Sequence, residues 1–494
     1  MQVASLLYLP DRVYRIKVAA ETKRNGYLGV VAMFSGREAL AGVVVVGGIV
    51  GAVPQVFAQQ SRASQTAAQS LEERVGDLDQ QLRILQRLRE LAADSATAAA
   101  KDRVTATAGA KDGFSLKSAD GKYVLRFRGY FQSDGRLFPS TETAGGIDNL
   151  LIRRARPILE ATVGRYFDFR LMPDFGGISP TIFDAYWEGK FLPQFTVRAG
   201  KFKPPVGLER LQSATDIAFA ERGIPTNLVP SRDVGLQLAG DISEGLFAYQ
   251  VGVFNGVPDL ANGGDDLSNA KDFTVRIFFQ PFEAGTLRGL GVGVAGTTGM
   301  ERGSTAAPSL PAYRTPGQQT FFRYNSSSTT PASNVFANGK RTRLSPQGYF
   351  YTGSLGLLGE YVISRNEVTL AGLTTELEHT AWGATGSFFL TGEKAGFRSP
   401  FPGKPFDLEN RGFGALELVG RYGQLELDEG SFPTYATITA SAQKATAWGL
   451  GINWHFTRAV KIAVNYEHTT FTGGALTGDR EPENAVITRF QTSF

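Results

Sequence analysis

The amino-acid sequence predicts an all-β protein: a 16-stranded antiparallel transmembrane β-barrel preceded by a short N-terminal coiled-coil helix. Apolar and polar residues alternate in short runs throughout residues 113–494, for example in 271–281 and 445–457. Such alternation is typical of strands that have one face toward lipid and one toward water. Sixteen runs can be counted, and their connections alternate between short and long. An even strand number and this asymmetry of connections are features of single-chain bacterial barrels.

The composition agrees with this fold and excludes others. The chain has 58 glycines and 35 phenylalanines among 494 residues, which suit tight turns and aromatic girdles. A hydrophobic fraction of 42% and a mean hydropathy of -0.13 do not indicate a bundle of membrane helices. The chain has no cysteine, which excludes disulfides and thiolate metal sites.

The net charge of +4 depends on the N-terminus. Residues 1–58 hold six basic and three acidic residues, which leaves 45 basic and 44 acidic residues in 59–494. A nearly neutral chain does not indicate a nucleic-acid partner. Any ion selectivity must therefore come from where the charges lie.

An apolar run over 39–53 is the longest in the chain. Arg37 precedes it and the small-residue site Val56-Phe57-Ala58 follows it, which is the layout of a secretory signal. We therefore expect 1–58 to be a signal peptide, cleaved after Ala58, whose N-terminus is over-extended because Met33 would start a signal of ordinary length. The alternative, a retained anchoring helix, would need a longer apolar run.

Residues 59–94 are predicted to form a periplasmic coiled coil. Core positions recur at heptad spacing with charged flanks. About four heptads are marginal alone, so a second oligomerising surface is required. A solitary amphipathic helix is the alternative, and a polar linker is expected over 95–112. The core positions are Ala68, Leu71, Val75, Leu78, Leu82, Leu85, Arg89 and Ala92.

The barrel is expected over 113–494. Short turns such as Gly164-Arg165 are assigned to the periplasmic side and longer loops to the outside. The connection 393–410 is long although it falls on the periplasmic side. Strands are expected near 122–132, 149–163, 166–174, 181–191, 194–201, 233–241, 246–255, 271–281, 288–300, 342–352, 355–364, 378–392, 411–427, 445–457, 460–471 and 484–494.

An insert of about thirty residues separates the strands near 194–201 and 233–241. A long insert between two barrel strands can fold into the lumen and narrow it. A basic insert in that place would select which ions pass. The basic residues of this stretch are Lys201, Lys203, Arg210, Arg222 and Arg232.

Arginines on the second strand follow the same alternation. If Leu151 and Ala155 face lipid, Arg154 and Arg156 face the lumen, and Arg153 must lie near a rim. Arginine suits an anion track because it stays charged and presents a planar fork of donors. The residues expected to bind anions or line the constriction are Arg126, Arg128, Arg153, Arg154, Arg156, Arg198, Lys201, Lys203 and Arg210.

The alternative to an anion track is a lumen whose mixed charges serve solubility. Arg314 and Arg323 fall in the longest external loop, so they are expected to influence ion selectivity much less than the lumen arginines.

Other sequence motifs give little indication of a nucleotide-binding or metal-binding site. The glycine pattern at 291–296 lies inside an alternating strand with no helix after it, and the three histidines show no metal-ligand spacing. We expect no cofactor, no metal and no enzymatic activity.

Ten stretches of the barrel occur in the order found in a known family. They include LIRRARPILEATV, RAGKFKPPVGLERLQSATDIAFAERGIPTNLVPSRDVGLQLAGD and VITRFQTSF. On these stretches the chain resembles the phosphate-selective porins O and P over 113–494, and the resemblance extends to the coiled-coil leader. The resemblance implies a trimeric outer-membrane porin with an inward-folded third loop and an arginine ladder to a central constriction. It marks Arg153, Arg154 and Arg210 as constriction residues.

The expected function is an anion-preferring diffusion channel for phosphate or related oxyanions. The channel is expected to be a homotrimer in the outer membrane of a Gram-negative bacterium, surrounded by lipid, with its coiled coil in the periplasm and able to reach the cell wall. The alternatives are a general small-solute porin with weak ion bias, and an envelope tether that the barrel only anchors.

Overall fold

The computed structural model describes residues 6–9, 12–15, 17–22, 28–33, 63–101, 103–109, 113–139, 146–243, 245–263, 269–327 and 329–494. The chain divides into two units, Met1–Ser95 and Ala96–Phe494. The apolar run expected to be the signal-peptide core, at 39–53, and the expected cleavage site after Ala58 lie outside the described residues.

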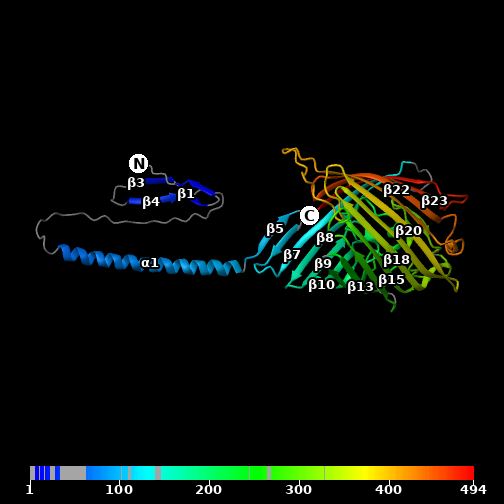
Figure 1. The fold of residues 1–494 in the computed structure, drawn as a ribbon, viewed down its shortest axis with the longest axis horizontal. Helices are drawn as coiled ribbons and strands as arrows, with labels where there is room; N and C mark the ends of the chain where they lie inside the picture. The colour runs from blue at the N-terminus through cyan, green and yellow to red at the C-terminus, as the bar shows by residue number, and fades with distance from the viewer. Residues whose placement is uncertain are drawn as a thin grey trace. The chain divides into compact units, whose positions relative to one another are not determined.

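The N-terminal part contains two hairpins and a long helix (Figure 1). β1 (Leu6–Leu9) pairs with β2 (Arg12–Arg15), and β3 (Lys17–Thr22) pairs with β4 (Leu28–Met33). Helix α1 (Ala63–Lys101) covers the predicted heptads. Within the described ranges, no helix has the length and apolarity that crossing a membrane requires. Four of the predicted core residues of α1 are between 56% and 61% exposed: Val75, Leu78, Leu82 and Leu85.

The described residues between 95 and 112 belong mostly to a helix and a strand, where the sequence predicts a polar linker. α1 continues to Lys101, because the run Ala98-Ala99-Ala100 favours helix. β5 (Thr105–Gly109) then pairs with β6 (Gly113–Lys117), and β6 pairs with the start of β7. The sheet of the barrel therefore begins earlier than the predicted boundary at residue 113.

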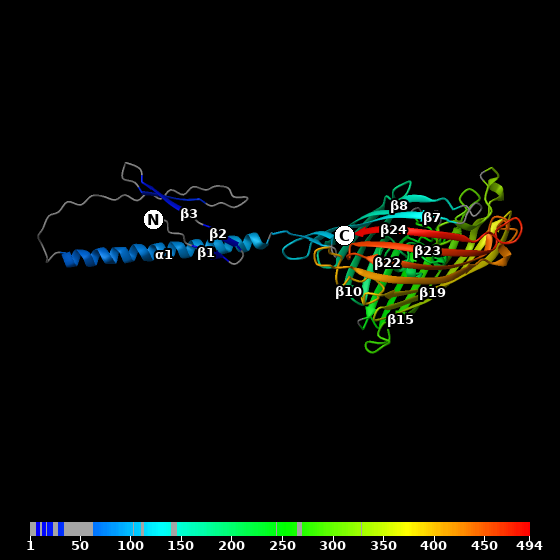
Figure 2. The same ribbon diagram turned by 90° about the horizontal axis from the view of Figure 1, so that it is seen from above.

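Sixteen antiparallel strands close the barrel (Figures 1 and 2), and each predicted strand coincides with one of them. Neighbours in sequence pair with each other, and β24 closes the barrel by pairing with β7. The strands are β7 (Val124–Leu137), β8 (Asn149–Val163), β9 (Phe167–Asp174), β10 (Thr181–Leu192), β11 (Phe195–Phe202), β12 (Asp233–Ile242), β13 (Phe247–Phe254), β14 (Asp272–Phe279), β15 (Leu290–Arg302), β18 (Phe336–Thr352), β19 (Leu355–Leu370), β20 (Leu373–Phe389), β21 (Ala415–Glu426), β22 (Ala442–His455), β23 (Val460–Gly473) and β24 (Glu483–Ser493).

One end of the barrel, here called the turn end, carries most of the short connections, and the other is called the loop end. Two connections break this pattern. β20 and β21 are joined at the turn end by residues 390–414, so the long connection expected there is real. β19 and β20 are joined at the loop end by Ala371-Gly372 alone, because both strands extend beyond their predicted ends.

Short elements occupy the longer loop-end connections. The connection between β15 and β18 contains a hairpin of β16 (Ala312–Arg314) and β17 (Thr320–Arg323), followed by the 3-10 helix η2 (Pro331–Ser333). A further 3-10 helix, η3 (Glu429–Ser431), lies between β21 and β22. Tyr313 and Phe322 of the hairpin are fully buried, so this connection packs against other parts of the barrel.

The faces of the wall are opposite to those of a soluble protein. On β12, Leu236 and Leu238 are exposed while Gln237 between them is buried. On β22, Trp448 and Leu450 are exposed while Asn453 is buried. An apolar outer face and a polar interior are what a membrane barrel requires.

Candidate functional site

The connection between β11 and β12, residues 203–232, folds into the barrel. It contains the short helix α2 (Leu208–Leu211) and the 3-10 helix η1 (Ile224–Leu228), and most of its side chains are buried. It reaches wall strands distant in sequence: the Leu208 N–H donates to Glu360 of β19 at 2.6 Å, and the Ala220 N–H donates to Asn465 of β23 at 2.7 Å. The inward fold that the sequence suggested for this insert is confirmed.

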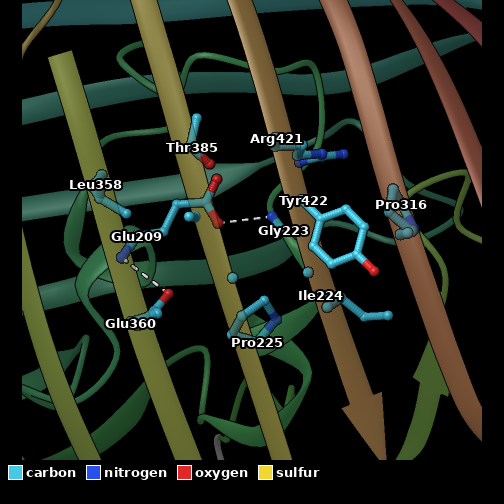
Figure 3. A pocket seen from close by; sticks show the side chains of 14 residues that line it. Glu209, Gly223, Ile224, Pro225, Pro316, Leu358, Glu360, Thr385, Arg421 and Tyr422 are labelled. Carbon is cyan, nitrogen blue, oxygen red and sulfur yellow. Dashed lines mark hydrogen bonds between the residues drawn. The ribbon is translucent and has the colours of Figure 1, made fainter.

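The strands that η1 approaches carry glycine there, which leaves room for the insert. Figure 3 shows Ile224 and Pro225 of η1 in the pocket at this part of the wall. A Cβ on Gly383 would lie 3.0 Å from Pro225, and one on Gly423 would lie 3.2 Å from Ile224. Inside the insert, the Gly223 N–H donates to the carboxylate of Glu209 at 2.7 Å. The insert is therefore held by close packing against the wall and by its own polar contacts.

Two β-bulges, one in β8 and one in β10, turn side chains of the barrel wall inward. In β8, Arg154 is opposite Gln132 and Ile152 is opposite Ser133, so Arg153 is the inserted residue. A bulge sends two successive side chains to the same side. Arg153 and Arg154 both point inward, which corrects the expected rim position of Arg153. It also brings Leu151 into register with the inward-facing Asp134, so Leu151 does not face lipid.

The second bulge is in β10. Ile182 is opposite Pro173 and Asp184 is opposite Met172, which leaves Phe183 as the inserted residue. Simple alternation would group Phe183 with Ala185 and the exposed Trp187. Because of the bulge, both Phe183 and Asp184 contact the interior.

Glu221 of the insert collects four guanidinium groups. Its carboxylate accepts from Arg153 at 2.5 and 3.1 Å, and from Arg154 at 3.3 Å. Arg136 of β7 and Arg489 of β24 each donate at 3.0 Å. Burial acts to raise the pKa of Glu221, but the charges of Arg153 and the other arginines outweigh burial and hold that pKa well below its ordinary value. Arg153 and Arg154 thus clamp the insert to the wall.

Two cavities flank the insert. The loop-side cavity has a volume of 390 Å³ and reaches Arg314 and Gln318 of the long loop-end connection. The turn-side cavity has a volume of 660 Å³ and reaches Thr457 and Phe494 at the turn end. Arg232 lines both cavities. Among the residues that the structure describes, one carboxylate, Glu221, lines the loop-side cavity together with seven arginines: Arg153, Arg154, Arg156, Arg210, Arg222, Arg232 and Arg314.

These arginines differ in how far their charge is neutralised. Arg156 is paired with Asp174 at 2.7 Å, and Arg232 with Asp184 at 3.2 Å. Arg210 donates to the Thr226 carbonyl at 2.9 Å, and Arg222 donates to the carbonyls of Glu209 and Gln212. In the described part of the chain, neither Arg210 nor Arg222 has a carboxylate in ion-pair contact. Within the insert, these two residues contribute the least compensated positive charge of the cavity.

Burial lowers the pKa of Arg210 to about 9 and that of Arg222 to about 10, with neighbouring charges as further causes. Both values are high enough to keep the side chains charged at neutral pH. Lysine has an ordinary pKa about two units lower than arginine. The same burial and neighbouring charges would therefore lower the pKa of a lysine at position 210 toward neutral pH.

The variant Arg210→Lys should consequently show an anion preference that falls between about pH 6 and pH 8.5, where the parent channel stays constant. Reversal potentials in a salt gradient at both pH values measure this. Arg323→Lys, at an exposed position, is the matched control and should not become pH-dependent. A pH-independent Arg210→Lys channel would show that position 210 is not desolvated.

The remaining predicted residues lie at several places. Arg128 lines the turn-side cavity and is 3.7 Å from Glu160. Arg126 is half-buried and opposite Glu160 in the register. Arg198 is paired with Glu188 at 2.6 Å, and Lys203 donates to the carbonyl of Gln212 at 2.7 Å; both line the turn-side cavity.

Two expectations are corrected. Lys201 is in register with Ala185 and Val234, on the outward face with Ala199, because period-2 alternation continues to the end of β11. It therefore does not share the lumen face of Arg198. Arg314 lines the loop-side cavity because the connection that carries it folds inward.

Sequence reasoning did not assign Arg222 or Arg232 to the anion-binding set. Both are in the basic insert, and this position in the sequence could have identified them as anion-binding candidates. It also missed Arg136 and Arg489, which lie at opposite ends of the barrel sequence and meet at Glu221 only when the barrel closes.

Comparison with known proteins places the barrel among porins. Residues 125–494 match the family model of phosphate-selective porin O and P. Porin O of Pseudomonas aeruginosa is 24% identical over 424 residues, which cover 78% of this chain and 91% of that protein. Two solved structures are similar at 10% identity: the outer membrane channel DcaP of Acinetobacter baumannii (TM-score 0.49, 76% of this chain and 99% of that chain) and the anion-selective porin from Comamonas acidovorans (TM-score 0.45, 75% and 100%).

Proposed function

The chain belongs to the family of phosphate-selective porins O and P, and on this basis we propose that it is an anion-preferring diffusion channel for phosphate or related oxyanions in the outer membrane of a Gram-negative bacterium. The single observation that carries the ion preference is the loop-side cavity, whose described lining contains seven arginines and one carboxylate. The pathway continues past Arg232 into the turn-side cavity. Solute moves down its gradient without a chemical reaction.

The arrangement supports passage as well as attraction. Guanidinium groups replace part of the hydration shell of an oxyanion with charge-assisted hydrogen bonds. Conduction requires that binding stays weak enough for release. Asp174 and Asp184 reduce the net charge of Arg156 and Arg232, so the pathway offers several moderate sites in series.

Reversal potentials in a potassium chloride gradient, followed by titration of the chloride current with phosphate, test this function. The proposal expects an anion-selective channel whose chloride current is blocked by phosphate. A channel with little ion preference and no phosphate block would instead support the general small-solute porin.

We propose further that the channel is a homotrimer and that α1 associates with two copies of itself in the periplasm, where it can contact the cell wall. The exposed heptad stripe of α1, which includes Leu78 and Leu85, supports this association. Such a short coiled coil is marginal alone, so the walls of the barrels must supply the rest of the interface.

Deleting residues 61–94 should lower the temperature at which trimers dissociate without changing the single-channel conductance. Native mass spectrometry and thermal melting on gels measure both states. Leu78→Ser with Leu85→Ser should reproduce the destabilisation, because apolar core residues drive coiled-coil association. Arg83→Ser with Arg87→Ser, on exposed positions that pair within the helix, is the matched control. Monomeric full-length protein would contradict the proposal.

A further inference from the structure

Phe183 is an aromatic residue in the wall of the loop-side cavity. Two guanidinium groups contact the face of its ring: Arg156 at 3.7 Å and Arg232 at 4.7 Å from the ring centre. These arginines come from different elements, Arg156 from β8 and Arg232 from the end of the insert. The ring therefore brings together one cation of the fixed wall and one cation of the insert.

The position of Phe183 depends on the bulge in β10. Bulges re-aim side chains and are common next to functional sites. Here the bulge turns inward both Phe183 and the following residue, Asp184, which is the carboxylate partner of Arg232. The bulge thus places both the aromatic ring that contacts Arg232 and the carboxylate that pairs with it.

The remaining contacts orient both guanidiniums. Arg156 donates from Nε to Asp174 and from Nη1 to the Tyr130 hydroxyl, each at 2.7 Å. Arg232 donates from Nε to Asp184 at 3.2 Å and from Nη1 to Ser231 at 3.3 Å. Among the described residues, no protein acceptor contacts Nη2 of either arginine, and both arginines line the cavity. Each guanidinium thus retains one terminal nitrogen with donors for a ligand.

We infer that Phe183 is a positioning residue that makes the channel discriminate polyatomic oxyanions from halides. The inference rests on the proposed function. Both arginines pack on the ring and line the same cavity, so an anion with several oxygens can accept from the two guanidiniums at once. A halide has a single acceptor centre and gains little from such a pair. Because Arg232 also lines the turn-side cavity, this pair is the point where the oxyanion passes from one cavity to the other.

Phe183→Leu tests the inference, because leucine keeps an apolar side chain in place but has no aromatic face. Loss of the cation–π contacts and of the orienting ring should raise the half-blocking phosphate concentration about threefold to tenfold. The anion-over-cation selectivity in potassium chloride should stay close to that of the parent channel, since no charge is removed. Phe183→Tyr should restore the parent value of the phosphate block.

Phe254→Leu is the matched control for packing loss. Phe254 is a buried aromatic residue of the barrel interior, whereas Phe183 is half-buried, and the described ring contact of Phe254 is another phenylalanine, Phe202, at 5.3 Å. Phosphate block should be unchanged in this variant. Phe183 has no positioning role if the Phe183→Leu channel assembles and is blocked by phosphate like the parent. The same holds if Phe254→Leu weakens the phosphate block as much as Phe183→Leu does. A parent channel without anion preference would overturn the proposed function itself, which is a different result.

Discussion

Replacing Arg210 and Arg222 together with glutamine should abolish the anion preference of the channel. These are the arginines of the loop-side cavity that donate to carbonyl groups and have no carboxylate in ion-pair contact within the described part of the chain. Arg156 and Arg232 are each paired with a carboxylate, Asp174 and Asp184, and Arg153 and Arg154 share the carboxylate of Glu221. Loss of these two charges therefore removes positive charge that no described carboxylate offsets by ion-pair contact.

The expected size of the effect follows from the geometry of a narrow lumen. Two unit charges 4 Å apart interact by about 4 kcal/mol at an effective dielectric constant of 20. A third of that energy changes the occupancy of an ion by about tenfold. The reversal potential in a potassium chloride gradient should therefore move to near zero or to the cation-selective side, and phosphate block should disappear.

The matched control is the double variant Arg288→Gln with Arg323→Gln, at two exposed positions. Salt screens exposed charges over about 8 to 10 Å, so this variant should retain anion preference. An Arg210→Gln, Arg222→Gln channel that conducts normally and remains anion-selective would show that the loop-side cavity is not the filter.

Replacing Glu221 with glutamine should release the insert from the barrel wall. Four arginines share this carboxylate, and the Glu221 carbonyl also accepts from Arg421 at 2.7 Å. Breaking a buried ion pair by removing one partner costs roughly 3–5 kcal/mol, because the remaining charges stay buried without compensation. We therefore expect a higher and noisier single-channel conductance and a lower thermal unfolding temperature.

Glu426→Gln is the matched control for removing a carboxylate, since Glu426 is an exposed residue of the wall. Its conductance and unfolding temperature should match those of the parent. Glu221→Asp keeps the negative charge, so its conductance and unfolding temperature should lie between those of Glu221→Gln and those of the parent. If Glu221→Gln leaves both conductance noise and stability unaltered, the insert is held by packing of η1 against the wall alone.

The sequence alone determined the architecture of this protein. A barrel strand must present apolar residues to lipid and polar residues to the lumen, so apolar and polar residues alternate along the sequence of each strand. This alternation can be recognised within each short stretch of sequence, and it located all sixteen strands and the insert between β11 and β12. The basic character of the insert and its resemblance to a family also marked Arg210 before the fold was known.

The tertiary structure decided which charges meet. Arg153 and Phe183 point inward because each is the extra residue of a bulge, and a bulge leaves no mark in a simple alternation. Arg136 and Arg489 reach Glu221 because β24 closes against β7, which joins residues separated by most of the barrel sequence. Ion pairing depends on distances of a few ångströms across the lumen, and those distances exist only once the barrel has closed around the insert.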